Sequence, residues 1–121
     1  MTDFADVAAR YIDTWNDTGS ASRLQRVESL FADDASYVDP LAAVAGHAGI
    51  NDAIGAVQTQ FPGFVFSLLG PVDGHHDQVR FTWGLGPAGQ ESPIDGFDVA
   101  VLNTDGRIAS VHGFLDKVPA G

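Results

Sequence analysis

Three aspartates stand at positions that helix caps and turns do not explain: Asp39, Asp95 and Asp98. Asp39 ends a short extended run, and Asp95 and Asp98 lie inside a run whose pattern predicts a strand. A carboxylate on an apolar pocket face has a raised pKa, which suits a general base acting on a carbon acid. A carboxyl that burial keeps protonated can instead donate a hydrogen bond to a developing oxyanion. We therefore take these residues as the candidates for acid–base chemistry.

Asp39 has two interpretations. Strand alternation places it on the same face as Tyr37, so the carboxylate could enter a pocket and serve as a base. As an alternative, it could accept backbone N–H groups in the Asp-Pro turn that it forms with Pro40.

Whether Asp95 or Asp98 points into the pocket depends on which face of their predicted strand is turned inward. Asp95 shares a face with Phe97 and Val99, whereas Asp98 falls on the opposite face. The phase of Phe97 and Val99 favours Asp95 as the inward residue. If Asp98 points inward instead, it would make a structural hydrogen bond or form a different acid–base site.

Aromatic residues could line a pocket beside these acids. Singly each fits a core, and together they suit a flat, apolar ligand. The candidates are Trp15, Tyr37, Phe61, Trp83 and Phe97. Tyr11 lies one helical turn before Trp15, and core packing with a backbone partner for its hydroxyl explains it equally well.

The histidines and cysteines give no metal site. His112 lies in the middle of a predicted strand and is a secondary acid–base candidate, although its alternation against Val111 and Gly113 favours an interface or core role. His75 and His76 occupy a predicted turn, where neighbouring side chains diverge. The chain has no cysteine, which excludes thiolate ligands and a cysteine nucleophile. We expect neither a metal nor a cofactor.

Composition excludes several classes of partner. The 121 residues carry 16 acidic and 6 basic side chains, a net charge of −10. Phosphate binding depends on lysine and arginine, so nucleic acid and anionic membranes are not expected partners. No apolar run approaches ~20 residues, and the first residues include Asp3 and Asp6 in place of a basic segment. A cytoplasmic protein is the expectation.

The elements that must position these residues follow from hydrophobic periodicity. Three-and-four spacing predicts three amphipathic helices, the first capped by Thr2 or Asp3 and the second by Ser20 or Ser22. Strand-like runs then predict a long antiparallel meander. The predicted helices lie within 4–15, 22–31 and 46–61, and the strands at 35–38, 64–69, 78–85, 94–102 and 107–115. This order predicts a single α+β domain over 1–121, with helices on one face of a curved sheet.

Several local strings then coincide with a known superfamily. They are Arg10-Tyr11-Ile12 with Trp15-Asn16, Leu30 to Ala35 leading to Tyr37-Val38-Asp39-Pro40, Gly46 with Ile50, and Asp105 to Ile108 with Gly113 to Asp116. The chain resembles the nuclear-transport-factor-2-like (NTF2-like) superfamily in its SnoaL-like branch. The resemblance implies an α+β cone that encloses a pocket for a small apolar or aromatic molecule, and a homodimer formed through the sheet.

The site positions are similar to those of bacterial ketosteroid isomerases. That resemblance implies a cofactor-independent proton-transfer enzyme in which Asp39 is the general base and Tyr11 and Asp95 form the oxyanion hole. A SnoaL-like cyclase or lyase is a related expectation. Two further hypotheses remain open: a non-catalytic binding protein for a small apolar metabolite, and a dimeric interaction module whose vestigial pocket is filled by its own aromatic side chains.

Overall fold

The computed structural model describes residues 2–119 and folds them into three helices and a seven-stranded sheet. The helices are α1 (Phe4–Asn16), α2 (Ser20–Leu30) and α3 (Gly46–Gln60). The strands are β1 (Phe31–Val38), β2 (Ala43–Ala45), β3 (Phe64–Leu68), β4 (Asp73–His75), β5 (Gln78–Pro87), β6 (Ile94–Leu102) and β7 (Ile108–Lys117). The predicted α+β class and the helical cover of the sheet are confirmed.

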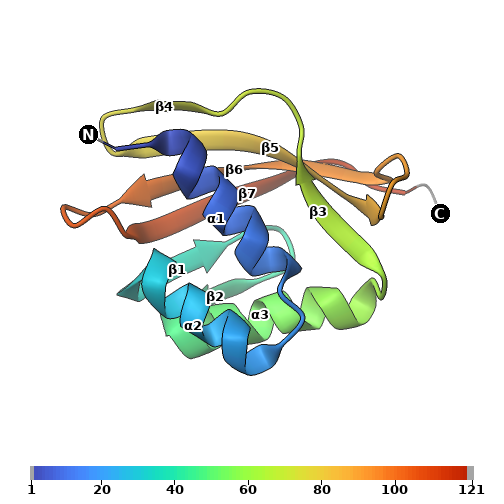
Figure 1. The fold of residues 1–121 in the computed structure, drawn as a ribbon, viewed down its shortest axis with the longest axis horizontal. Helices are drawn as coiled ribbons and strands as arrows, with labels where there is room; N and C mark the ends of the chain where they lie inside the picture. The colour runs from blue at the N-terminus through green and yellow to red at the C-terminus, as the bar shows by residue number, and fades with distance from the viewer. Residues whose placement is uncertain (1, 120–121) are drawn as a thin grey trace.

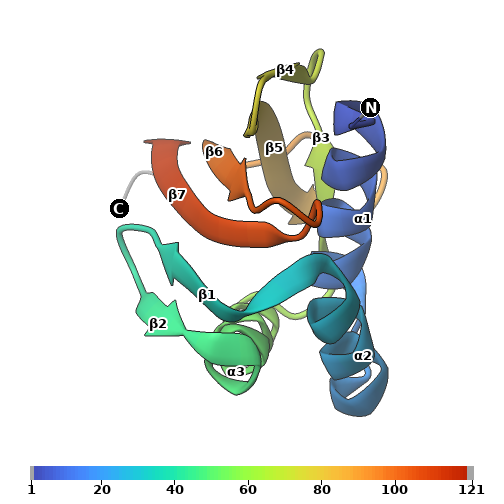
Figure 2. The same cartoon turned by 90° about the vertical axis from the view of Figure 1, so that its left-hand side faces the viewer.

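The sheet has the order β2-β1-β7-β6-β5-β3, and β4 pairs with β5 (Figure 1). All pairings are antiparallel except that of β1 with β7, which adds the first strand to the β7 edge of the later meander. The sheet curves strongly, so that β1 and β2 with α3 turn toward the concave side that α1 also covers (Figure 2). This curvature leaves room for a cavity between the helices and the sheet.

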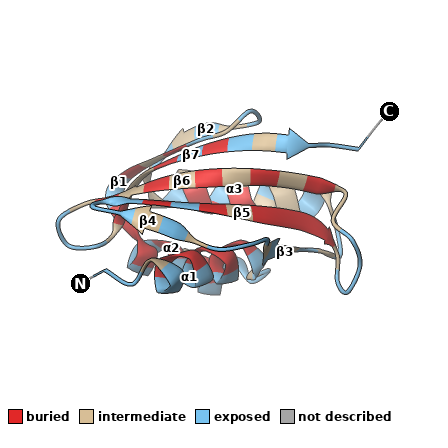
Figure 3. Cartoon of the chain, turned by 90° about the horizontal axis from the view of Figure 1, so that it is seen from above, coloured by how far each residue is buried: buried red, intermediate tan, exposed pale blue. Residues whose placement is uncertain are grey.

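Helix α1 supplies one wall of that concave side. Asp3 caps it, because its side chain accepts a hydrogen bond from the backbone N–H of Asp6 at 3.0 Å. Its buried stripe carries Tyr11 and Trp15 and packs against β3 and β5, while its other face is exposed (Figure 3). The apolar spacing of the first residues therefore fixes which side chains enter the interior.

Arg23 of α2 holds the three helices together. Its side chain is buried, and its Nε donates to Asn51 Oδ1 at 2.6 Å. Its Nη1 donates to Gln58 Oε1 at 2.7 Å and to the carbonyl oxygen of Asp17 at 3.2 Å. Because Asn51 and Gln58 belong to α3 and Asp17 follows α1, this side chain fixes the end of α1 close to Trp15.

Several local boundaries differ from the sequence prediction. Strand β1 begins at Phe31, not at residue 35, because Phe31 pairs with Ile108 of β7 and is fully buried there. The predicted cap at Ser20 or Ser22 is wrong: Gly19 precedes α2 without a side-chain cap, and the hydroxyl of Ser22 donates to Asp17. The short strands β2 and β4 occupy segments predicted as loop and turn. No helix within residues 2–119 is long and apolar enough to cross a membrane.

Candidate functional site

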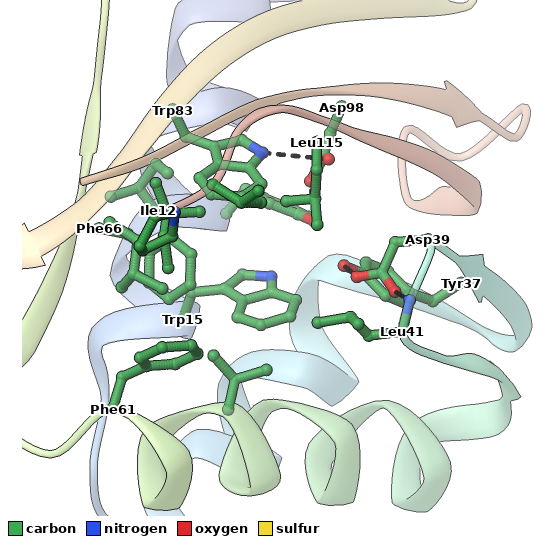
Figure 4. Close-up of a pocket in the computed structure, with 16 residues that line it drawn as sticks. Ile12, Trp15, Tyr37, Asp39, Leu41, Phe61, Phe66, Trp83, Asp98 and Leu115 are labelled. Atoms are coloured by element: carbon green, nitrogen blue, oxygen red, sulfur yellow. Dashed lines mark hydrogen bonds between the residues drawn. The ribbon is translucent and has the colours of Figure 1, made fainter. Parts of the chain in front are cut away.

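A cavity of about 230 Å³ lies between the helices and the concave face of the sheet. Its lining comes from α1, α3, the end of β1, the strands β3, β5, β6 and β7, and the segment after β7. The lining includes Tyr11. It also includes the labelled residues Trp15, Tyr37, Asp39, Leu41, Phe61, Phe66, Trp83, Asp98 and Leu115 (Figure 4). No lysine, arginine or histidine of residues 2–119 contributes to this lining, so its ionisable groups are two carboxyls and two phenols.

Asp98 is the buried acid of the cavity. Only 3% of its surface is exposed, and two donors hold its carboxylate. The Tyr11 hydroxyl donates to Oδ2 at 2.5 Å, and Trp83 Nε1 donates to Oδ1 at 3.1 Å. Helix α1, strand β5 and strand β6 therefore meet at one carboxylate, which β6 points toward the cavity (Figure 4).

Burial raises the pKa of the Asp98 carboxyl to about 6. The hydrogen bonds from Tyr11 and Trp83 lower this pKa, but their effect is smaller than that of burial. The nearby charge of Asp39 raises it further. Burial and then the Asp98 charge raise the pKa of Tyr11 well above its usual value, so the phenol stays protonated and remains a donor. Asp98 therefore exchanges a proton close to neutral pH while its two donors keep theirs.

Asp39 combines both interpretations that the sequence left open. Its Oδ1 accepts the backbone N–H groups of Leu41 and Ala42, both at 2.8 Å, as in an Asp-Pro turn. Its Oδ2 accepts the Tyr37 hydroxyl at 2.5 Å, and the residue also lines the cavity. Three donors therefore hold one carboxylate, which fixes the orientation of the Asp39 side chain at the cavity.

Gly113 separates the two carboxylates. It pairs with Asp98 across β6 and β7, and a Cβ placed on it would lie 2.7 Å from Asp98 Oδ1. The same Cβ would lie 3.2 Å from Asp39 Cβ. The missing side chain at this position leaves the space in which both acids face the cavity.

The prediction that Asp95 faces the pocket is wrong. Asp95 lies on the outer face of β6, where its carboxylate is 3.8 Å from Lys117 Nζ. Phe97 is also on the outer face, stacked on Phe114 with ring centroids 5.0 Å apart, and it does not line the cavity. His112 is exposed on the same outer face and does not line the cavity either. The inward phase of β6 carries Ile94, Gly96, Asp98, Ala100 and Leu102.

The other predicted residues meet at the cavity. Tyr11 and Asp39 line it, as do Trp15, Tyr37, Phe61 and Trp83. The Tyr11 hydroxyl binds a carboxylate, not a backbone group. Nine lining residues were not predicted, and Phe66 and Leu41 are two of them. The alternation of Phe64, Phe66 and Leu68 could have indicated the first, whereas nothing in the sequence indicates that Leu41 reaches the mouth.

One donor in the cavity wall is free. Trp15 is 5% exposed, and its Nε1 is the one buried side-chain nitrogen or oxygen of the described residues that has no hydrogen-bond partner. The indole lies near enough to the Tyr11 hydroxyl to lower the pKa of that phenol in part, yet the two make no regular hydrogen bond. In Figure 4 this nitrogen faces the space below Trp83 and Asp98.

Residues 8–111 match the model of the SnoaL-like domain. The chain belongs to the SnoaL-like family. A structure from Agrobacterium tumefaciens, provisionally named an isomerase of that family, is 40% identical, with a TM-score of 0.91. The match covers 96% of this chain and 99% of that one. No curated protein matches the chain.

More distant structures show the fold alone. A structure from Sinorhizobium meliloti, provisionally named a polyketide cyclase, is 21% identical over 89% of this chain and 93% of that one, with a TM-score of 0.70. An NTF2-like protein of unknown function from Exiguobacterium is 23% identical over 91% and 98%, with a TM-score of 0.71. The predicted NTF2-like fold and SnoaL-like branch are confirmed.

Proposed function

We propose that this SnoaL-like pocket protein is a cofactor-independent proton-transfer enzyme that isomerises a small apolar carbonyl compound. The observation that carries the proposal is the buried Asp98 carboxylate, held by Tyr11 and Trp83 at the wall of an apolar cavity. A base whose pKa lies near the working pH combines a high ionised fraction with useful basicity. The name of the Agrobacterium relative supports the same reaction class.

The chemistry assigns different roles from those that the ketosteroid isomerase resemblance implies. The Asp98 carboxylate removes a proton from the carbon beside the ligand carbonyl, so the C–H electron pair moves into a carbon–carbon double bond and the carbonyl oxygen becomes negative. The protonated Asp98 then returns the proton to a different carbon, and no oxidant or second substrate is consumed. Tyr11 and Trp83 position the base in place of binding the substrate oxygen, because both donate to Asp98.

Asp39, which Gly113 separates from Asp98, acts on the Asp98 carboxyl through its charge in this mechanism. Its negative charge raises the pKa of Asp98, which strengthens that base. Backbone N–H groups and Tyr37 hold the Asp39 carboxylate in place, so this effect does not depend on a mobile side chain. Asp39 is therefore a positioning and electrostatic residue in our proposal, and Asp98 is the catalytic one.

The alternative of a vestigial pocket requires an interior filled by Trp15, Trp83 and Phe61. These three residues line an open cavity and do not fill it, which argues against that alternative. A non-catalytic binding protein uses the same cavity, and the test of turnover below separates it from an enzyme.

The experiment is hydrogen–deuterium exchange at the carbon beside the carbonyl of small cyclic ketones such as 1-indanone, followed by proton NMR in D₂O. The proposal predicts exchange catalysed by the wild-type protein and reduced at least ~100-fold in Asp98→Asn. Asp95→Asn is the matched control, because it makes the same change on the same strand but on the outer face. Equal exchange in wild type and Asp98→Asn would contradict the proposal. Tight binding without exchange in any variant would support the binding protein.

A further inference from the structure

The donors of the cavity are unequally available. Trp83 Nε1 and the Tyr11 hydroxyl are both engaged by Asp98, and the Tyr37 hydroxyl is engaged by Asp39. Trp15 Nε1 remains without a partner although it is buried. A buried N–H to which the protein supplies no acceptor is costly, so a ligand that supplies an acceptor offsets that cost.

The charges of the cavity select against one kind of acceptor. Two carboxylates line it, and no positively charged side chain of the described residues does. A carboxylate or phosphate on the ligand would therefore meet like charge in a poorly solvated space. An uncharged acceptor such as a ketone oxygen avoids that repulsion and still satisfies the indole N–H.

The size of the cavity limits the rest of the ligand. At about 230 Å³ it is smaller than the ~300–1,000 Å³ of pockets that enclose drug-sized molecules. The rings of Trp15, Phe61, Phe66 and Trp83 give it flat, apolar walls (Figure 4). A monocyclic or bicyclic ring system matches these dimensions, whereas a steroid or a tetracyclic polyketide would extend out of the open mouth.

We infer that Trp15 is the specificity-determining donor of this site and that its ligand is an uncharged monocyclic or bicyclic ketone whose oxygen accepts the Trp15 Nε1 hydrogen. This inference rests on the proposed function for the position of the ketone beside Asp98. In the reaction the same N–H meets the oxygen that becomes negative, so it takes the place that the resemblance gave to Tyr11 and Asp95.

A set of four probes on one skeleton tests the inference by binding alone, without turnover. They are 1-indanone, indane, 2-aminoindane and indane-2-carboxylate. We expect 1-indanone to bind tightest to the wild-type protein and the carboxylate weakest. Trp15→Phe should weaken 1-indanone about tenfold and leave indane within about twofold, because only the ketone loses a hydrogen bond. Tighter binding of the ammonium probe, equal binding of the carboxylate, or an equal loss for ketone and hydrocarbon would overturn the inference.

A measurement on the wild-type protein covers the case in which Trp15→Phe does not fold. The chain has two tryptophans, so its ¹H–¹⁵N spectrum holds two indole resonances, which Trp83→Phe assigns. Saturating 1-indanone should move the Trp15 indole proton downfield, and indane should not. A Trp15 resonance that responds equally to both probes would overturn the inference. Because these readouts report binding, a protein that binds 1-indanone through Trp15 but exchanges no protons would contradict the proposed function and leave this inference standing.

Discussion

Tyr11 and Asp98 are 87 positions apart in the chain, and the hydroxyl of the first lies 2.5 Å from the carboxylate of the second inside the cavity. The contact joins α1 to β6 across the concave face of the sheet. Because Trp83 binds the other carboxylate oxygen, Asp98 has a fixed orientation before any ligand enters. This preorganisation is what a general base requires, and it determines the predictions that follow.

The titration of Asp98 should stand apart from that of the other aspartates. We expect its side-chain carboxyl carbon to titrate with a pKa of about 6 in ¹³C NMR. Asp39→Asn should lower that pKa, because the variant removes a negative charge that favours the protonated form. Tyr11→Phe should raise it, because the variant removes a hydrogen bond to the ionised form. Shifts of the opposite sign would contradict the network described here.

Stability should depend on pH in a way that Asp98 controls. Folding raises the Asp98 pKa from 3.8 to about 6, so the folded state binds more protons than the unfolded state between those values, and stability falls as pH rises. The free energy of unfolding of wild type, measured relative to Asp98→Asn, should fall by about 2 kcal/mol between pH 4 and pH 7. Urea unfolding at several pH values checks this. A difference that stays constant with pH, or grows, would contradict the burial of an ionisable group at this position.

Gly113→Ala should damage the site more than the fold. The new methyl group would lie 2.7 Å from Asp98 Oδ1 and 3.2 Å from Asp39 Cβ, so the Asp98 carboxylate must move away from Trp83. We expect a loss of about 1–3 kcal/mol in stability and weaker binding of 1-indanone, with the circular dichroism of the backbone unchanged. Ligand titration and urea unfolding measure the two effects. Wild-type affinity in this variant would show that the space between the acids is not part of the site.

The outer face of the sheet predicts a homodimer, which we propose as the solution state. Phe114 is 53% exposed and stacks on Phe97, and Val38 is 47% exposed beside the same strand β7. An apolar face of this kind is commonly covered by a second copy. Phe114→Glu should therefore give a monomer in sedimentation equilibrium, whereas Ala9→Glu on the exposed face of α1 should not. A wild-type monomer would refute the proposal.

The sequence was sufficient for the architecture because each helix repeats its apolar residues at the spacing of one face. The stripe that holds Tyr11 and Trp15 is buried as predicted. Which of Asp95 and Asp98 faces the cavity was harder to predict, because strand β6 carries apolar residues on both faces. Phe97 and Val99 suggested the inward phase, yet they lie outside, and the inward phase contains the smaller Gly96 and Ala100.

The reason for this inversion lies in contacts that only the fold creates. Trp83 packs over Gly96, where a Cβ would lie 2.5 Å from its ring, so a large side chain cannot occupy the inward phase there. The sequence could not indicate that the Trp15 N–H lacks a partner either. That depends on the contact of the Tyr11 hydroxyl with Asp98, which only the fold creates. Residue types therefore identified the candidates, and the packing of Trp83 over Gly96 with the hydrogen bond from Tyr11 to Asp98 decided among them.

We propose that Asp98 transfers the proton, and the pH dependence of exchange at the carbon beside the carbonyl of 1-indanone tests this role most directly. We expect the wild-type rate to rise with pH to a plateau, with a midpoint near the Asp98 pKa of about 6. In Asp98→Asn the protein-catalysed rate should fall at least ~100-fold and lose this midpoint, while Asp95→Asn should follow the wild-type profile. An Asp98→Asn variant with the wild-type rate and profile would contradict the role of Asp98 as the base.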